Sequence, residues 1–247
     1  MTPHTLDLRS AHTALAACDT AFDRLAQLLI DHNQTTNLTR IETPQHIHTR
    51  HFLDSLAGLA VLDEMAAATT ASAFSVIDVG SGAGFPGLAI SIARPEWRIV
   101  SLEATDKKAH FQRQVCDRLG LTNVEVRHGR AEAMAHDAAL REQFGAVTAR
   151  ALAGLDVLAE LTMAFVRPGG IGVFWKGAQV QEEISAAEAA FEKMGAAITQ
   201  LLDYRLPEKC SAAAHSAFFL AIAQKRVVTP PRYPRQNYAA IKKRPLR

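Results

Sequence analysis

Hydrophobic residues recur along this chain with two different periods. Over the first 70 residues the apolar positions lie three or four apart, which is the spacing of one face of a helix. Residues 22–29 carry such a face and predict a helix that ends near Asp31. A second helix is predicted after Thr43 and Pro44, because an N-cap residue followed by proline is typical of a helix start.

From residue 74 onwards, short β-rich runs alternate with amphipathic stretches. The predicted strands are 74–79, 97–103, 124–127, 146–150 and 171–175. The predicted helices are 86–93, 106–119, 154–165 and 181–194, the third of them ended by Arg-Pro-Gly-Gly at 167–170. This alternation predicts right-handed crossovers and a mostly parallel sheet that is covered on both faces.

The end of the alternating region departs from this pattern. Runs at 198–204 and 216–223 are joined by a loop too short for a crossover helix, so we expect an antiparallel pair that closes the sheet. The predicted fold is therefore α/β, a doubly wound, Rossmann-like sheet of seven strands. We expect three parts: a helical extension at 1–70, the α/β domain at 71–226 and a tail at 227–247.

Composition is typical of a globular protein, with 48% hydrophobic and 21% charged residues. No apolar run reaches the length of a membrane span, and charged residues occupy the first 30 positions, where a secretory signal needs an apolar segment. We expect a cytoplasmic protein that does not bind membranes, and a monomer.

The net charge of +2 hides a strongly basic tail. The last 24 residues hold eight basic side chains and no acidic one: Lys225, Arg226, Arg232, Arg235, Lys242, Lys243, Arg244 and Arg247. Four prolines and two tyrosines lie among them, and such a segment tends to stay extended. It is either a solvated tail or an arm that follows phosphates, stacks its tyrosines on unpaired bases and becomes ordered only on nucleic acid.

The cysteines and histidines predict no metal site. Cys18, Cys116 and Cys210 are widely spaced and form no C-x-x-C pair, so we expect free thiols packed as small hydrophobic residues. The ten histidines show no H-E-x-x-H or other metal-binding spacing.

The strongest local signal is a glycine-rich turn that follows the first predicted strand. The sequence from 76 to 87 is Val-Ile-Asp-Val-Gly-Ser-Gly-Ala-Gly-Phe-Pro-Gly, with glycines at 80, 82, 84 and 87. In an open α/β sheet, ligands bind beyond the carboxyl ends of the strands, and glycine lets the backbone approach them closely. The amides of the turn, including those of Gly80 and Gly82, favour an anionic or carboxylate group.

Glu103 indicates the kind of ligand. It ends the second predicted strand, where an acid can accept both hydroxyls of a ribose, so an adenosyl compound is expected. The glycines at 82, 84 and 87 also satisfy the dinucleotide fingerprint, which keeps NAD open. Asp78 favours S-adenosylmethionine, because a carboxylate there could meet an ammonium group rather than a diphosphate.

The chain resembles the glucose-inhibited division protein B family, bacterial enzymes that methylate N7 of one guanine in small-subunit ribosomal RNA. The matching segments run in order along nearly the whole chain: 37–39, 50–56, 78–87, 130–132, 149–152, 175–177 and 233–235. The glycine turn is shared with many methyltransferases. The combination of the segment 50–56 with the Phe-Pro-Gly ending of the turn and the Tyr-Pro-Arg of the tail is specific to this family.

The resemblance implies a set of residues that bind the methyl donor. Gly80 and Phe85 would contact S-adenosylmethionine, and Ala131 and Glu132 would flank its adenine. Arg150 would line the same pocket, which agrees with its position at the carboxyl end of a predicted strand.

Three further residues are candidates for contact with RNA. Arg50 and Lys176 can neutralise phosphates, and His51 can stack on a base or donate to it. Each also has a purely structural alternative: an ion pair from Arg50 to Asp54 on the same helix, a half-buried His51 between the domains, and a solvated Lys176 at a strand end.

The tail supplies the other RNA candidates, Arg235, Lys242 and Lys243. Residues 237–240 are Asn-Tyr-Ala-Ala where the family has a Gly-Thr-Pro turn, so the RNA contacts of this arm are less safely transferred. The hypothesis is a direct methyl transfer to guanine N7 in 16S rRNA. An NAD-dependent oxidoreductase and a non-catalytic rRNA-binding assembly factor are the alternatives.

Overall fold

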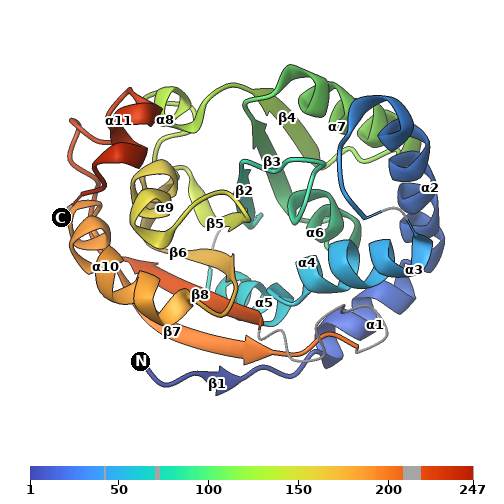
Figure 1. Cartoon of the computed structure of the whole chain (residues 1–247), viewed down its shortest axis with the longest axis horizontal. Helices are drawn as coiled ribbons and strands as arrows, with labels where there is room; N and C mark the ends of the chain where they lie inside the picture. Colours follow the sequence, from blue (N-terminus) through green and yellow to red (C-terminus); the bar gives the residue numbers. More distant parts are fainter. Residues whose placement is uncertain (42, 70–72, 208–217, 247) are drawn as a thin grey trace.

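A computed structural model describes residues 1–41, 43–69, 73–207 and 218–246 of the chain. It contains one eight-stranded sheet with the strand order β1-β7-β8-β6-β5-β2-β3-β4 (Figure 1). The strands are β1 (His4–Thr5), β2 (Ser75–Val79), β3 (Arg98–Glu103), β4 (Val124–His128), β5 (Phe144–Arg150), β6 (Val166–Lys176), β7 (Ala196–Tyr204) and β8 (Phe218–Lys225).

The order of the strands creates a place for a ligand. Strands β4, β3, β2, β5 and β6 are parallel, whereas β8 runs antiparallel to both β6 and β7. The chain goes from β2 outwards to β3 and β4 and then returns to β5 on the other side of β2. Ligands of doubly wound sheets bind at such a reversal, beyond the carboxyl ends of the strands.

Helices cover both faces of the sheet, as Figure 1 shows. One face carries α1 (Arg9–Ala17), α2 (Asp19–Thr36), α3 (Pro44–Ile47), the π-helix η1 (His48–Leu53), α4 (Asp54–Leu56), α5 (Leu59–Ala67), α6 (Gly87–Ala93) and α7 (Asp106–Leu119). The other carries α8 (Ala131–Met134), α9 (Leu155–Thr162), the 3-10 turn η2 (Met163–Phe165), α10 (Val180–Lys193) and α11 (Tyr238–Lys243). Each face has its own hydrophobic core, because alternate side chains of a strand point to opposite sides.

The predicted α/β fold is confirmed, with two differences. The sheet has eight strands rather than seven, because His4 and Thr5 pair with Leu202 and Asp203 at its edge. The predicted end of a helix at 167–170 lies within β6 instead. There β5 pairs Phe144 with Val166 and then Ala146 with Ile171, so the four residues between form a bulge.

The N-terminal region is helical, as predicted, but its helices have other limits. Helix α2 continues to Thr36, five residues past the predicted end. The Thr43 side chain accepts a hydrogen bond from the His46 amide and caps α3, as predicted. The second predicted helix is interrupted by the π-helix η1 and by a turn before α5.

The three expected parts of the chain share cores. Phe22 and Phe52 of the N-terminal helices belong to the same hydrophobic cluster as Val76 of the sheet. The boundary expected at 70/71, the first two residues of the run 216–223, and the predicted thiol of Cys210 all lie outside the described residues. The division into three parts therefore remains a proposal.

The tail is packed against the domain, contrary to the expectation of an extended segment. Ile241 is fully buried and Leu246 is 8% exposed. The expectation was wrong because these apolar residues and specific hydrogen bonds anchor the basic stretch, as described below. No helix in the described part of the chain combines the length and the apolar character that crossing a membrane requires.

Candidate active site

The glycine turn lies between β2 and α6 and is held by a buried carboxylate. Asp78 is fully buried, and its two oxygens accept from the Gly87 amide at 2.8 Å and the Thr148 hydroxyl at 2.9 Å. Burial raises the pKa of Asp78 to about 6, although the two hydrogen bonds oppose this shift. Asp78 therefore fastens the turn to β5, and the hypothesis that it meets a ligand ammonium stays a prediction.

Two glycines show why this turn needs its sequence. A Cβ at Gly87 would lie 2.9 Å from the Asp78 carboxylate, so a larger residue would displace the hydrogen bond between them. Gly80 has φ +68°, and a Cβ there would lie 2.7 Å from the side chain of Leu152. Glycine at these two positions thus lets the backbone of the turn lie against Asp78 and Leu152.

Glu103 lies opposite this turn at the end of β3, as predicted. It is 6% exposed and accepts from the Gly82 amide at 2.8 Å and from the Thr105 amide at 2.7 Å. Gln112 of α7 supports the turn from below, donating to the Ser81 hydroxyl at 2.7 Å and to the Gly82 carbonyl. Gln112 was not predicted as a site residue, since a polar residue on a helix gives no sign that it is buried.

The first cavity, the glycine-turn cavity, has a volume of about 190 Å³. It is lined by residues from the ends of β2, β3 and β4, from α8 and α9, and from the tail: Val79, Gly80, Leu102, Ala104, Gly129, Arg130, Ala131, Glu132, Leu152, Leu161 and Tyr238. The structure thus brings together Gly80, Ala131 and Glu132, which the resemblance assigned to one ligand. Leu152, Leu161 and Tyr238 were not predicted to line it.

A second cavity of about 650 Å³, the Arg150 cavity, lies at the ends of β5 and β6. It is lined by Ile41, Arg50, His51, Asp54, Arg150, Ala151, Trp175, Lys176, Gly177, Ala178, Gln179, Glu183, Tyr204 and Phe218. Arg150, which the resemblance placed in the donor pocket, lines this second cavity. The guanidinium lies 5.7 Å from the ring centre of Phe85 of the glycine turn, so Arg150 and Phe85 are neighbours where the two regions meet.

Arg150 is fixed by a buried network. Its Nη1 donates to the Asp54 carboxylate at 2.8 Å and to the Arg50 carbonyl at 3.1 Å. The other oxygen of Asp54 accepts from the Tyr204 hydroxyl at 2.6 Å. Burial and the nearby Asp54 raise the pKa of Tyr204 well above its ordinary value, so this hydroxyl stays a donor. The network ties the π-helix to the carboxyl ends of the strands.

His51 projects from the π-helix onto the glycine turn. Its ring stacks on Phe85, with centroids 4.9 Å apart and planes 5° apart. Nε2 lies 2.8 Å from the Thr39 hydroxyl and Nδ1 lies 3.3 Å from Nη2 of Arg150. Burial, with Arg150 and Arg50 nearby, lowers the pKa of His51 to about 3, so its imidazole is neutral at physiological pH.

The charged side chains of the other predicted RNA residues differ in their ion pairs and in their exposure to solvent. Arg50 does not pair with Asp54, and its guanidinium lies 4.7 Å from the ring centre of Phe218. The side chain of Lys176 is 9% exposed and forms a 2.5 Å ion pair with Glu183, so it is not solvated, and its contact with RNA stays a prediction. Arg235 likewise pairs with a buried acid on α9.

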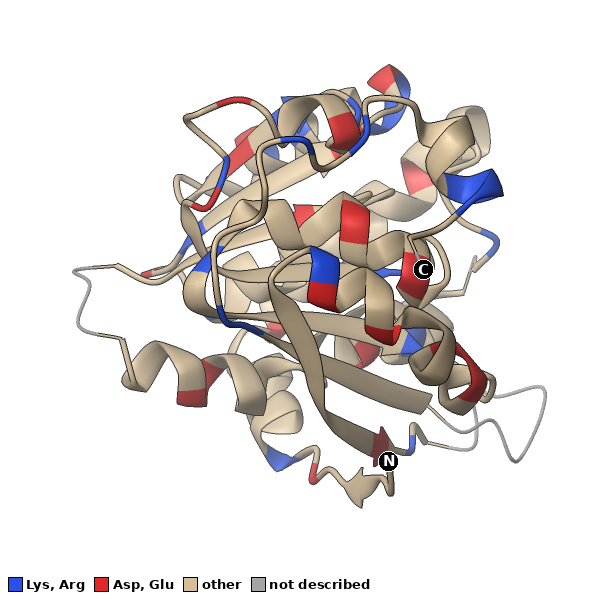
Figure 2. Ribbon diagram, turned by 90° about the vertical axis from the view of Figure 1, so that its left-hand side faces the viewer, with Lys and Arg blue, Asp and Glu red and all other residues tan. Residues whose placement is uncertain are grey.

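Lys242 and Lys243 remain exposed on α11, close to the C-terminus. Figure 2 shows a basic stretch of helix near that terminus, while acidic and basic residues mix over the rest of this side. Of the RNA candidates in the tail, these two lysines are therefore the ones whose charges face solvent.

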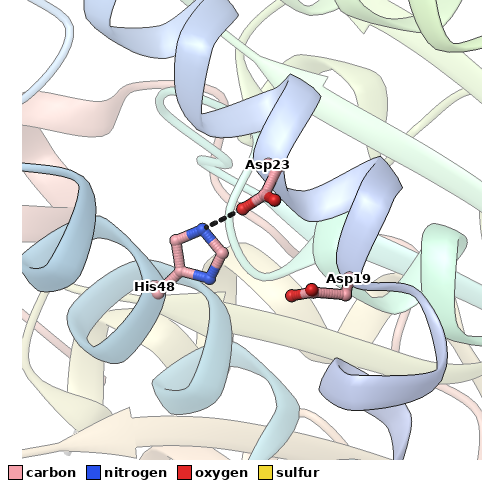
Figure 3. Close-up of side chains that lie close together, drawn as sticks. All are labelled: Asp19, Asp23 and His48. Carbon is pink, nitrogen blue, oxygen red and sulfur yellow. Dashed lines mark ion pairs between the residues drawn. The ribbon is translucent and has the colours of Figure 1, made fainter.

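Asp19, Asp23 and His48 form a group of possible metal ligands outside both cavities (Figure 3). Their ligand atoms lie within 4.8 Å of one another. Both aspartates are exposed, and Asp23 pairs with His48 at 3.1 Å. This pair joins α2 to the π-helix, and none of the three residues lines either cavity.

The architecture and the glycine turn at the sheet reversal define a Rossmann-like fold with a ligand site at the strand ends, and the family match makes the class a methyltransferase. Residues 19–208 match the family model GidB, described as rRNA small subunit methyltransferase G, and the chain belongs to this family. S-adenosylmethionine is the methyl donor of this enzyme class.

Curated relatives match over most of their length. The ribosomal RNA small subunit methyltransferase G of Leuconostoc citreum is 37% identical over 222 residues, which are 90% of this chain and 89% of that protein. The protein of the same name from Deinococcus radiodurans is also 37% identical, covering 87% of this chain and 81% of its own.

Solved structures share the fold at lower identity. Cofactor-bound Rv0187 from MTB matches with a TM-score of 0.52 and 21% identity, covering 87% of this chain and 90% of that one. A 16S rRNA (adenine(1408)-N(1))-methyltransferase from Catenulisporales acidiphilia matches with a TM-score of 0.51 and 16% identity, covering 69% and 94%.

Proposed function

We propose that this protein transfers the methyl group of S-adenosylmethionine to N7 of a guanine in 16S rRNA of the small ribosomal subunit. The observation that carries this proposal is the match to the rRNA methyltransferase family over residues 19–208. The same family match argues against the two alternatives that the sequence left open, an oxidoreductase and a non-catalytic assembly factor.

The adenosine part of the donor is proposed to enter the glycine-turn cavity. Its apolar walls suit an adenine, and Ala131 and Glu132 lie where the resemblance puts that base. Leu102 and Ala104, on either side of Glu103, line the cavity, and the Glu103 carboxylate is proposed to meet the ribose at its edge. Gly82 donates to one oxygen of Glu103 and Thr105 donates to the other, so each oxygen keeps a further lone pair for a hydroxyl group.

The target guanine is proposed to enter the Arg150 cavity. This cavity offers the guanidinium groups of Arg50 and Arg150 to an anionic RNA backbone or to the acceptor atoms of a base. The stacked rings of His51 and Phe85 lie where the cavity meets the glycine turn. A nucleobase in the cavity and a donor at the turn would therefore approach each other at this stack.

Methyl transfer to guanine N7 depends on the positioning of the two reactants rather than on proton transfer. Bound S-adenosylmethionine supplies an activated methyl group on a positively charged sulfur. Guanine N7 carries a lone pair and no proton, so the chain needs no general base to generate the nucleophile. Orienting two reactants can contribute up to roughly 7–11 kcal/mol to the barrier reduction.

Access to N7 sets the form of the substrate. In an A-form helix the groove that exposes N7 is deep and narrow, so the target guanine must be unpaired or extruded. The neutral ring of His51 suits a contact with an extruded guanine. An uncharged ring can stack on the base, whereas a protonated imidazole could donate to the N7 lone pair and compete with the methyl group.

The direct test combines labelling with mapping. Purified small subunits from a strain that lacks the protein are incubated with enzyme and with donor labelled in the methyl group. The RNA is then cleaved at N7-methylguanosine by borohydride and aniline, and the break is located by primer extension. We expect one enzyme-dependent break; label without a break would place the methyl group elsewhere and overturn the N7 assignment.

We propose that the protein acts in the cytoplasm, where its ribosomal substrate is assembled, and that it acts as a monomer without a metal ion. The nucleophile supports the last point, since it needs no metal to deprotonate it. Sedimentation of the purified protein tests the monomer, and activity in the presence of a chelator tests the metal.

A further inference from the structure

The C-terminal segment reaches the glycine-turn cavity. Helix α11 packs on α9 through Ile241, which is fully buried against Val157 and Leu161. Asn237 caps this helix, accepting from the Ala240 amide at 3.1 Å. Tyr238, the first residue of the helix, thereby becomes part of the cavity wall, as Leu161 of α9 does.

The segment is held in this place by polar contacts with the domain. The carboxylate of Glu160 is fully buried and accepts from the Arg235 guanidinium at 2.7 and 2.9 Å and from the Arg235 amide at 2.8 Å. Arg141 donates to the carbonyls of Thr229 and Tyr233 at 2.8 and 2.9 Å. These contacts fix the chain on the approach to Tyr238.

The ring of Tyr238 is also oriented from the cavity side. The guanidinium of Arg130 lies 5.0 Å from the centre of that ring, and its Nε donates to Glu132 at 2.8 Å. Both Arg130 and Glu132 line the glycine-turn cavity. Tyr238 is thus coupled to the residues that would flank the adenine, although it comes from the far end of the chain.

We propose that Tyr238 is a donor-binding residue and that the C-terminal segment from Tyr233 to Leu246 is a wall of the donor pocket. This inference rests on the proposed function, because the ligand of the cavity is S-adenosylmethionine. An aromatic ring gives an adenine a flat partner, and stacking of a base on an aromatic side chain is sequence-tolerant and strong. The other described residues that line the cavity are glycines, aliphatic residues such as Leu152 and Leu161, and the charged Arg130 and Glu132, and none of them has an aromatic face.

Calorimetric titration with S-adenosylmethionine tests the inference. Tyr238→Ala should weaken donor binding by roughly ten-fold, the loss of one base-stacking partner, whereas Tyr238→Phe keeps the ring and should bind as wild type does. Gln236→Ala is the matched control, because Gln236 is exposed on the same segment and does not line the cavity. Equal affinities of Tyr238→Ala and the wild type would overturn the proposal.

Kinetics separate a donor contact from a general effect on the enzyme. In Tyr238→Ala the KM for S-adenosylmethionine should rise about ten-fold, while kcat at saturating donor and the KM for the small subunit stay unchanged. A fall in kcat with an unchanged KM for the donor would assign Tyr238 another role. If the wild type itself binds no S-adenosylmethionine, the proposed function fails; if only the variant comparison fails, the function stands without this contact.

Discussion

The ion pair between Asp54 and Arg150 gives a sharp test of how the active site is held together. Their side chains are 11% and 14% exposed, and Asp54 also accepts from Tyr204. Asp54→Asn keeps the shape but removes the charge that both donors face. Removing one partner of a buried pair costs about 3–5 kcal/mol, and since the amide oxygen still accepts one hydrogen bond, we expect about 3 kcal/mol.

The cost is measured by urea denaturation followed through tryptophan fluorescence. Trp175 reports on the region directly, because its Nε1 donates to the Asp54 carbonyl at 2.7 Å. Asp63→Asn is the matched control: its pair with Arg94 is more exposed, with side chains at 34% and 22%, and should cost no more than about 1 kcal/mol.

A double-mutant cycle with Arg150→Met completes the test. If the two residues act through their contact, the double variant loses at least 1 kcal/mol less than the sum of the single losses. Methyl transfer at saturating donor should fall in Asp54→Asn while donor affinity is unchanged, since neither residue lines the glycine-turn cavity. Additive losses, or an Asp54→Asn cost equal to that of the Asp63 control, would refute this account.

Three other predictions concern the donor, pH and RNA. Gly80→Arg should abolish donor binding in calorimetry and leave the circular dichroism spectrum unchanged; retained affinity would contradict the site. The pKa of His51 is lowered from 6.5 to about 3 in the folded protein. Between these two pH values the unfolded chain binds a proton at His51 and the folded chain does not, so the stability of the fold decreases as the pH drops. Denaturation at pH 7 and pH 4 should therefore show a smaller loss for His51→Gln than for the wild type, and parallel losses would contradict the shift. Replacing Lys242 and Lys243 by alanine should weaken RNA binding and reduce its salt slope by roughly 1.4; an unchanged slope would exclude both lysines from phosphate contact.

Elements with a strong local signal could be predicted from the sequence to the residue. Helix α7 begins and ends where expected, because its apolar stripe is regular and Gly120 adopts φ +67° just after it. The antiparallel pair that closes the sheet was predicted because the loop between the runs 198–204 and 216–223 is too short for a crossover helix. The glycine turn with Glu103 was predicted as a ligand site, and the structure places Gly82 and Glu103 in hydrogen-bonding contact.

What could not be predicted depends on partners far away in the sequence. The basic tail was expected to be extended, yet its fixed conformation follows from Glu160, a buried acid 75 positions before Arg235. The part that Asp78 plays in holding the turn was not predicted, because sequence cannot show that Thr148 and Gly87 donate to its oxygens. The π-helix is equally invisible, since the wider turn that directs His51 onto Phe85 does not alter the apolar spacing enough to mark it.

These long-range contacts explain how a reaction without a general base can depend on many residues. The two cavities are built from different parts of the chain, and the distance between their ligands is set by the elements that join them. Asp78 fastens the glycine turn to β5, and Asp54 of α4, directly after the π-helix, pairs with Arg150 at the end of the same strand. Both the glycine turn, where the donor is proposed to bind, and the wall of the cavity proposed for the target are therefore held to strand β5. Because the chemistry needs alignment more than proton transfer, small shifts at either fastening should lower the rate without removing any group that touches the methyl.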